Sequence, residues 1–196
     1  MKIIGITGPT GAGKTTALRA LEELGGIIID ADAVYHDLTK TSLPMRKELE
    51  ERFGPVYDEA GRLDRKKLGN VVFNDPAALK ELNAITHRFV GEAIDGILAQ
   101  ARRENRPAAA IDAIALIESG VGEKCDALVA ILAPEETRVC RIMVREGITE
   151  EYARARVNAQ QGEEFFRAHC PYILMNDGAD PAEFAAKAKA LFQTLL

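Results

Sequence analysis

Several features are scarce in this 196-residue chain, and each scarcity excludes a class of protein. The chain has 3 cysteines and no Cys-x-x-Cys pair, so neither a disulfide framework nor a zinc knuckle is expected. Its longest apolar runs, such as Leu128 to Ala133, are far shorter than the roughly 20 residues that a membrane span needs. We therefore predict reduced thiols and no membrane-spanning helix.

The chain also lacks an excess of positive charge. Its 25 Lys and Arg residues stand against 30 Asp and Glu residues, which gives a formal net charge of -5. A nucleic-acid binder of this charge would need a segregated basic patch. Met1 to Gly5 has the pattern of a strand and not of a charged-then-apolar leader. We expect a cytoplasmic monomer or weak homo-oligomer with no nucleic-acid or membrane partner.

Short apolar runs alternate with longer segments of helical period, which predicts an α/β fold of one domain. Each apolar run is closed by a polar residue, Gly or Pro, as expected for strands of a parallel sheet with helices on both faces. The five candidate strands are Ile3 to Thr7, Ile27 to Asp30, Ala108 to Asp112, Leu128 to Leu132 and Tyr172 to Asn176.

The stretch between the second and third candidate strands has no strand pattern. It is far longer than the crossover of about a dozen residues that a parallel pair needs. Its pattern predicts helices over Pro44 to Phe53, Arg65 to Phe73, and from Pro76 to about Asn105, and allows a break near His87. We therefore expect an inserted helical subdomain over residues 33–106.

Three further helices are expected after the fourth strand. The first ends at Gly147, the second opens at Thr149, and the last begins near Asp180-Pro181. In the first two, we expect Arg138 and Arg154 on solvated faces with glutamate partners. Arg141 and Arg145 lie four residues apart on one helical face and would point at a common target if that helix lines a phosphate site.

The strongest motif is Gly8-Pro9-Thr10-Gly11-Ala12-Gly13-Lys14-Thr15, which fits GxxxxGK[ST] between an apolar strand and a helical segment, Thr16 to Leu24. Glycine permits the positive φ and close approach that let backbone N–H groups surround phosphate. Lys14 is then expected at the β and γ phosphates and the Thr15 hydroxyl on Mg²⁺. The predicted nucleoside triphosphate contacts are Gly8, Gly11, Ala12, Gly13, Lys14, Thr15 and Thr16.

Among proteins with this loop, a small kinase fits best. The Asn-Lys-x-Asp segment of guanine-binding switch proteins does not occur in the sequence, and the length excludes the two joined cores of a motor or helicase. A kinase acceptor should bind past the carboxyl end of a strand beside the loop. Asp30 and Asp32 lie there: each is either a helix N-cap or the base that takes the acceptor proton. Asp112, after the third strand, is either a Mg²⁺ group or a strand-end cap.

A series of motifs follows these in order over nearly the whole chain. It comprises Gly8 to Thr15, Leu24-Gly25-Gly26, Ile29-Asp30-Ala31-Asp32, Phe53-Gly54, Gly61-Arg62-Leu63-Asp64-Arg65, Leu68, Val72-Phe73, Ile85-Thr86-His87, Glu118, Arg141, Arg145, Arg156 and Gln160. Together they resemble the dephospho-CoA kinase family. The resemblance implies a P-loop kinase core, a helical CoA-binding subdomain, and a mobile lid over residues 138–162.

The resemblance also implies a reaction and roles for single residues. ATP, with Mg²⁺, would phosphorylate the ribose 3′-hydroxyl of dephospho-CoA. Asp32 falls on the proposed base, Lys14 on the loop lysine, and Arg141 on the arginine that faces the transferring phosphate. Further carried-over positions are Arg145 and Asn176 for ATP, Arg65, His87 and Glu118 for the acceptor, and Thr15 and Asp112 for the metal.

Two departures from the family pattern and several alternatives remain. Residues 113–117 replace a proline-containing run, and His87-Arg88 replaces His-Pro, which should alter a helix start. Arg65 either pairs with the Asp64 cap or contacts the acceptor diphosphate, and His87 is either structural or an acceptor contact. The competing functions are another small-molecule or nucleoside monophosphate kinase, and a non-catalytic nucleotide sensor.

Overall fold

The structure, a computed structural model, describes residues 1–178 and 180–196. The chain divides into two compact units, one of residues Met1–Ile29 with Ala101–Leu196 and the other of residues Asp30–Gln100. The strands are β1 (Lys2–Thr7), β2 (Ile27–Asp30), β3 (Ala108–Asp112), β4 (Ala127–Leu132) and β5 (Tyr172–Met175). The helices are α1 (Lys14–Glu23), α2 (Ala31–Thr41), α3 (Leu43–Phe53), α4 (Arg65–Val72), α5 (Pro76–Arg103), the 3₁₀ helix η1 (Val121–Lys124), α6 (Glu135–Glu146), α7 (Glu150–Asn158), α8 (Glu163–His169) and α9 (Pro181–Leu195).

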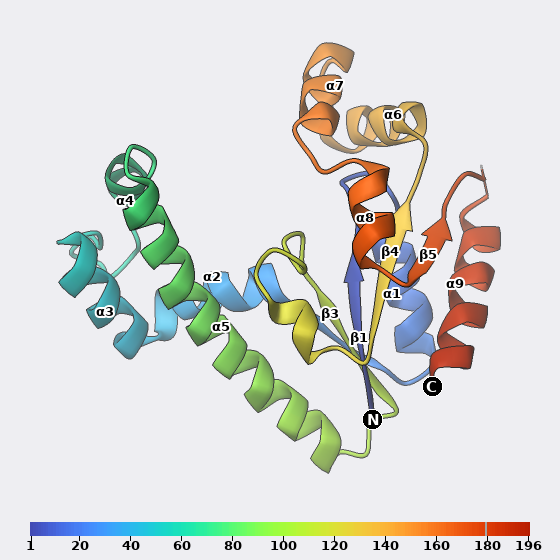
Figure 1. The fold of residues 1–196 in the computed structure, drawn as a ribbon, viewed down its shortest axis with the longest axis horizontal. Helices are drawn as coiled ribbons and strands as arrows, with labels where there is room; N and C mark the ends of the chain where they lie inside the picture. Colours follow the sequence, from blue (N-terminus) through green and yellow to red (C-terminus); the bar gives the residue numbers. More distant parts are fainter. Residues whose placement is uncertain (179) are drawn as a thin grey trace. The chain divides into compact units, whose positions relative to one another are not determined.

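The strands form one five-stranded sheet in the order β2-β3-β1-β4-β5 (Figure 1). β1 pairs in parallel with both β3 and β4, and β4 pairs in parallel with β5. The predicted α/β fold is confirmed, and each strand lies within one residue of its predicted bounds. This order puts the loop after β1 at the carboxyl end of the central strand, where α/β sheets bind ligands.

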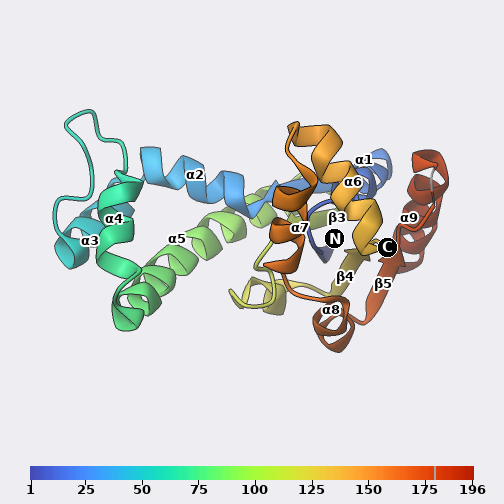
Figure 2. The ribbon, with the colours of Figure 1, turned by 90° about the horizontal axis from the view of Figure 1, so that it is seen from above.

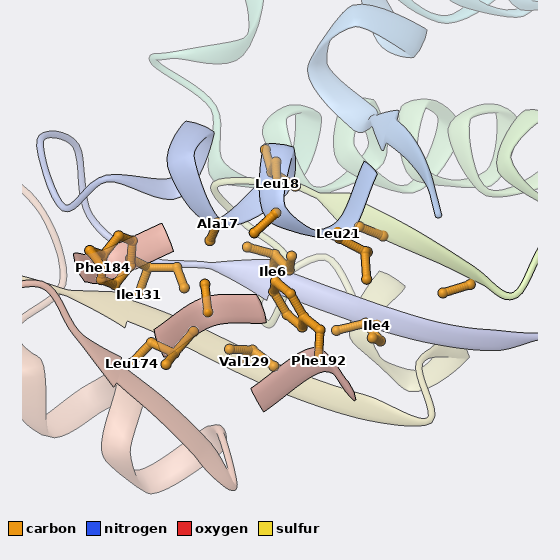
Figure 3. Packing of buried hydrophobic residues seen from close by; sticks show 14 of the residues in the cluster. Ile4, Ile6, Ala17, Leu18, Leu21, Val129, Ile131, Leu174, Phe184 and Phe192 are labelled. Atoms are coloured by element: carbon orange, nitrogen blue, oxygen red, sulfur yellow. The ribbon is translucent and has the colours of Figure 1, made fainter. Parts of the chain in front are cut away.

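The core of the sheet unit follows from side-chain alternation along β4. Val129 and Ile131 pack with residues of α1 and α9, as Figure 3 shows, whereas Ala130 and Leu132 pack with Phe166 of α8. Because successive side chains of a strand point to opposite faces, α1 and α9 cover one face and α8 the other. Burial of each such aliphatic side chain contributes about 1.5 to 3 kcal/mol.

The unit of residues Asp30–Gln100 is helical and has a core of its own. Met45, Leu49 and Phe53 of α3 pack with Leu68 and Val72 of α4. Its helix starts carry the capping residues that short helices need: Asp30 caps α2, Ser42 caps α3, and Asp64 caps α4.

α5 corrects one prediction of the sequence analysis. It runs from Pro76 to Arg103 without the break allowed near His87. Arg88 supplies the backbone N–H that a proline would remove, and its side chain pairs with Glu48 and Glu92, so the helix continues.

None of the helices in the described residues combines the length and apolarity that crossing a bilayer requires.

α6 and α7 lie side by side and form a helical hairpin, visible in Figures 1 and 2. As predicted, α6 ends at Gly147, which has φ of 65°, and α7 opens at Thr149, whose hydroxyl accepts from the Tyr152 N–H. Val139 and Ile142 of α6 pack against Ala153 and Val157 of α7. The short α8, which the sequence analysis missed, follows this hairpin and has two acidic residues in its first turn.

Candidate active site

The loop between β1 and α1 has the backbone that its glycines predict. Gly8 has φ of 137° and Gly13 has φ of 105°, values that residues with a Cβ rarely adopt. A Cβ at Gly8 would lie 2.1 Å from the Ile131 carbonyl oxygen, and one at Gly13 would lie 2.2 Å from Nδ2 of Asn176. Both positions therefore require glycine for conformation and for space.

The start of α1 is suited to an anion. Gly13 is its N-cap and makes no side-chain cap, so the first N–H groups of the helix and the positive end of its dipole face the loop. Lys14, the first helical residue, folds back so that Nζ donates to the Gly8 carbonyl oxygen at 2.9 Å. Lys14, Thr15 and Thr16 thus lie in the first turn of α1, next to the loop, and their contacts with phosphate stay a prediction.

Three successive loop carbonyls accept hydrogen bonds from side chains outside the loop. The Thr10 oxygen accepts from Nε of Arg138 at 3.0 Å, the Gly11 oxygen from Nη1 of Arg141 at 3.3 Å, and the Ala12 oxygen from Nδ2 of Asn176 at 2.8 Å. In a trans peptide the next N–H points opposite to the carbonyl. The N–H groups that follow therefore point away from these side chains; that of Ala12 donates to the Pro9 carbonyl oxygen at 3.2 Å, and those of Gly11 and Gly13 are suited to phosphate oxygens.

Asn176 and Arg141 brace the loop together. Asn176 is buried, and its Oδ1 accepts from Nη2 of Arg141 at 3.3 Å while its amide holds the Ala12 carbonyl. The family resemblance implies that Asn176 contacts ATP. Its position supports the loop from behind, and direct contact with ATP stays a prediction.

Arg141 and Arg145 do not share a target in the structure, which corrects the prediction from their spacing. Arg145 is 58% exposed at its side chain and donates to Glu146 at 2.6 Å, and Arg156 pairs with the same carboxylate. Hydrogen bonds from Arg145 and Arg156 lower the pKa of the Glu146 carboxyl. Arg145 lies one helical turn, about 5.4 Å, beyond Arg141, so its guanidinium contacts the Glu146 carboxylate and not the loop.

Arg138 corrects another prediction. It is buried, at 8% exposure, and donates to Thr10 and to Gln160 in place of the solvated glutamate pairing expected of it. Arg154 has the expected environment and pairs with Glu136 at 2.7 Å and Glu150 at 2.8 Å. The sequence held no local signal that separates the two arginines, because the partners of Arg138 are distant along the chain.

The metal residues proposed from the sequence are oxygen donors of the sheet unit. Thr15 is exposed at the start of α1, and Asp112 ends β3 with a buried Oδ1. β3 pairs with β1, which places Asp112 opposite Ile6 in the register and near the strand end that leads into the loop. Mg²⁺ prefers oxygen ligands and keeps phosphate oxygens and waters beside one or two carboxylates, so this donor set fits it.

A cavity of about 350 Å³ adjoins the phosphate loop within the sheet unit. Gly8, Pro9, Ile114, Glu118 and Phe166 are among the residues that line it. The departure from the family pattern at residues 113–117 therefore bears on this cavity, where Ile114 is 58% exposed. Glu118, proposed as a contact of the acceptor, lines this cavity together with Pro9 of the loop.

In the helical unit, the structure decides the role of Asp30 and places Arg65 beside His36 and not on the Asp64 cap, while the acceptor contact of Arg65 stays a prediction. Oδ1 of Asp30 accepts from the Ala33 N–H at 2.9 Å, which confirms it as the N-cap of α2, and Asp32 is exposed in the first turn of that helix. Asp64 caps α4, whereas Nη2 of Arg65 lies 2.9 Å from Nδ1 of His36. His87 is exposed on α5.

Comparison with known proteins decides the family. The sequence matches the dephospho-CoA kinase family over residues 2–181. The chain belongs to this family. It is 35% identical to the dephospho-CoA kinase of Thermobifida fusca over 98% of this chain and 95% of that protein.

Two solved structures share the fold of this dephospho-CoA kinase family member over nearly their whole length. TT1252 from Thermus thermophilus has a TM-score of 0.79 and 33% identity, covering 100% of this chain and 98% of that chain. Dephospho-CoA kinase from Campylobacter jejuni has a TM-score of 0.69 and 27% identity, covering 98% and 96%. The ordered motifs of the sequence therefore identified the family correctly.

Replacement of Gly13 by alanine is expected to weaken ATP binding by at least about tenfold, because the positive φ alone costs about 1 to 2 kcal/mol and the new Cβ meets the Asn176 amide. Calorimetric titration with ATP measures this loss. Gly96→Ala is the matched control, since Gly96 lies within α5 with open space around it, and alanine there should keep ATP affinity and stabilise the helix. Equal ATP affinity of the two variants would contradict the assigned role of Gly13.

Proposed function

We propose that the chain transfers the γ-phosphate of ATP to the ribose 3′-hydroxyl of dephospho-CoA, giving CoA and ADP. The phosphate loop carries the proposal: the carbonyls of Thr10, Gly11 and Ala12 accept from Arg138, Arg141 and Asn176, which turns the Gly11 and Gly13 N–H groups away from these side chains. Membership of the dephospho-CoA kinase family supports the acceptor.

In the proposed mechanism the loop and α1 hold the triphosphate while charge spreads over the transferring group. The Lys14 ammonium bridges the β and γ phosphates. The Arg141 guanidinium, which donates to the Gly11 carbonyl oxygen and to Oδ1 of Asn176, is proposed to face the transferring phosphate. Fixed positive groups of this kind lower the barrier because they need no reorganisation as charge develops.

Asp32 is proposed to orient the acceptor hydroxyl and to take its proton. Its carboxylate is exposed in the first turn of α2 and is available to a substrate. Asp30 is assigned a different task, since its Oδ1 is already used as the N-cap of α2. Arg65, His87 and Glu118 are proposed as contacts of the acceptor, with Arg145 and Asn176 on the side of ATP.

Mg²⁺ is proposed as the companion of ATP, held by the Thr15 hydroxyl and by Asp112. When bound, the ion would neutralise charge on the β and γ phosphate oxygens. We further propose that residues 138–162 act as a lid over the nucleotide, that the inserted helical unit binds the CoA moiety, and that the protein works in the cytoplasm as a monomer or weak homo-oligomer.

A panel of acceptors tests the proposal. Purified protein is incubated with ATP, Mg²⁺ and, in parallel, dephospho-CoA, AMP, shikimate or a nucleoside, and ADP release is followed with mass spectrometry of the product. We expect rapid turnover of dephospho-CoA alone. If the protein phosphorylates shikimate or AMP but not dephospho-CoA, the proposed acceptor is wrong, although the protein is still a small-molecule kinase. ATP binding with no turnover of any acceptor would favour the nucleotide sensor.

A further inference from the structure

Thr10, the third residue of the phosphate loop, is held by two side chains from distant parts of the chain. Its N–H donates to Oε1 of Gln160 at 3.0 Å, and its hydroxyl accepts from Nε2 of the same amide at 2.9 Å. Its carbonyl oxygen accepts from Nε of Arg138 at 3.0 Å, and Nη2 of Arg138 donates to Oε1 of Gln160 at 2.7 Å. All three polar groups of Thr10 thus belong to one ring of four hydrogen bonds, which we call the loop latch.

The loop latch buries the charged side chain of Arg138. Burial lowers the pKa of the Arg138 guanidinium, so the surroundings disfavour its charged form. Well-packed apolar side chains often replace such buried charges without loss of stability. A buried arginine with two oriented hydrogen-bonding partners, the Thr10 carbonyl oxygen and Oε1 of Gln160, is better suited to selecting one backbone conformation of the loop.

The latch also joins the loop to the helical hairpin α6–α7. A Cβ at Gly11, the residue after Thr10, would lie 2.9 Å from the Arg138 carbonyl oxygen, so the loop rests on the backbone of α6. Gln160 follows the end of α7, and its N–H donates to the Val157 carbonyl oxygen at 3.3 Å. Val157 packs on α6, so the Gln160 amide is fixed to the end of the hairpin.

We propose that Gln160 is a positioning residue of this kinase. Through the loop latch it holds the phosphate loop in the conformation that receives the terminal phosphates of ATP, and it couples that conformation to the hairpin α6–α7. Its amide touches Thr10 and not the reacting atoms, so it acts by preorganising the loop and thereby raises ATP affinity. The inference rests on the proposed function for ATP only and is independent of the acceptor.

Gln160→Leu removes the amide and keeps the size of the side chain. We expect the dissociation constant of ATP, measured by calorimetry without acceptor, to rise about tenfold, the loss that a hydrogen bond to a charged group produces. The KM for ATP should rise in parallel, while the KM for dephospho-CoA stays near wild type. The thermal midpoint should fall as well, because the Thr10 N–H and Nη2 of Arg138 lose their acceptor. The matched control is Gln193→Leu, the same change at an exposed position of α9, which should bind ATP normally.

Variants of Thr10 keep the test decisive if Gln160→Leu folds poorly. Thr10→Val removes the hydroxyl that Gln160 donates to and should weaken ATP binding, whereas Thr10→Ser keeps it and should restore the affinity. The double variant should lose less than the product of the two single losses. ATP should also slow hydrogen exchange of the α7 amides in the wild type and no longer do so in Gln160→Leu.

Two results would overturn the proposal. One is ATP affinity within about twofold of wild type, a difference of less than 0.5 kcal/mol, in both Gln160→Leu and Thr10→Val. The other is a lower thermal midpoint with unchanged ATP affinity, which assigns the latch to stability alone. A wild type that binds ATP but does not phosphorylate dephospho-CoA would contradict the proposed acceptor and leave this inference standing.

Discussion

Lys14→Ala is expected to lower the turnover number by about 10²- to 10³-fold or more, the loss found when a preorganised group at a developing charge is removed. Lys14 is the first residue of α1, and its Nζ lies on the Gly8 carbonyl oxygen at 2.9 Å, at the edge of the loop. A point charge that bridges the β and γ phosphates stabilises the transition state more than the bound ground state, because charge moves onto the bridging oxygen only as the bond breaks. ATP binding should therefore persist while turnover is lost.

The measurement is steady-state turnover with calorimetric ATP binding on the same preparation. Lys187→Ala is the matched control, since Lys187 is on α9 and pairs with Glu183 one turn earlier, an interaction of a few tenths of a kcal/mol. It should be indistinguishable from wild type in both assays. An unchanged turnover number in Lys14→Ala would show that the phosphate loop takes no part in phosphoryl transfer.

Asp32→Asn is expected to lower the single-turnover rate by about 10²- to 10⁴-fold, the range typical of the loss of a general base. Asparagine keeps the shape and the hydrogen bonds of aspartate but lacks the charge that accepts the acceptor proton. Since Asp32 lies outside the phosphate loop, the dissociation constant of ATP should stay nearly unchanged.

Asp30→Asn is the matched variant two residues away, with the same chemical change. Oδ1 of Asp30 accepts from the Ala33 N–H, and an asparagine oxygen can accept the same bond, so α2 keeps its cap. We expect a modest change of the thermal midpoint and a single-turnover rate near wild type. If Asp30→Asn abolishes the rate and Asp32→Asn keeps it, the base is the other carboxylate. If both keep it, phosphoryl transfer here relies on positioning and charge stabilisation, which a loose transition state permits.

Local signals predicted much of this protein correctly. The glycines of the loop are required by their own backbone angles, and Gly147 and Thr149 end and begin helices through contacts within a few residues. Asp30 caps α2 by a bond to a residue three positions on. Each of these interactions is short in sequence, so its residue types carry the information.

The errors had an identifiable physical origin as well. The pattern of the segment allowed a break near His87, but the next residue is Arg88, and an arginine leaves the helix hydrogen bonds intact. α8 was missed although Glu163 and Glu164 open it and Arg167 and His169 close it, the charge order that a helix dipole favours. That signal was present in the sequence and could have been used.

The sequence by itself determined the α/β class, the strands, the phosphate loop and the family, because each depends on residue types at short, fixed spacings. Only the tertiary structure decided which arginines of α6 contact the loop and which one does not. Arg138, Arg141 and Arg145 are alike in sequence, yet one is buried on Thr10, one braces Gly11, and one pairs with Glu146. The partners of Arg138 lie 128 and 22 residues away along the chain, so only the packing of α6 and α7 against the loop brings them within hydrogen-bonding distance.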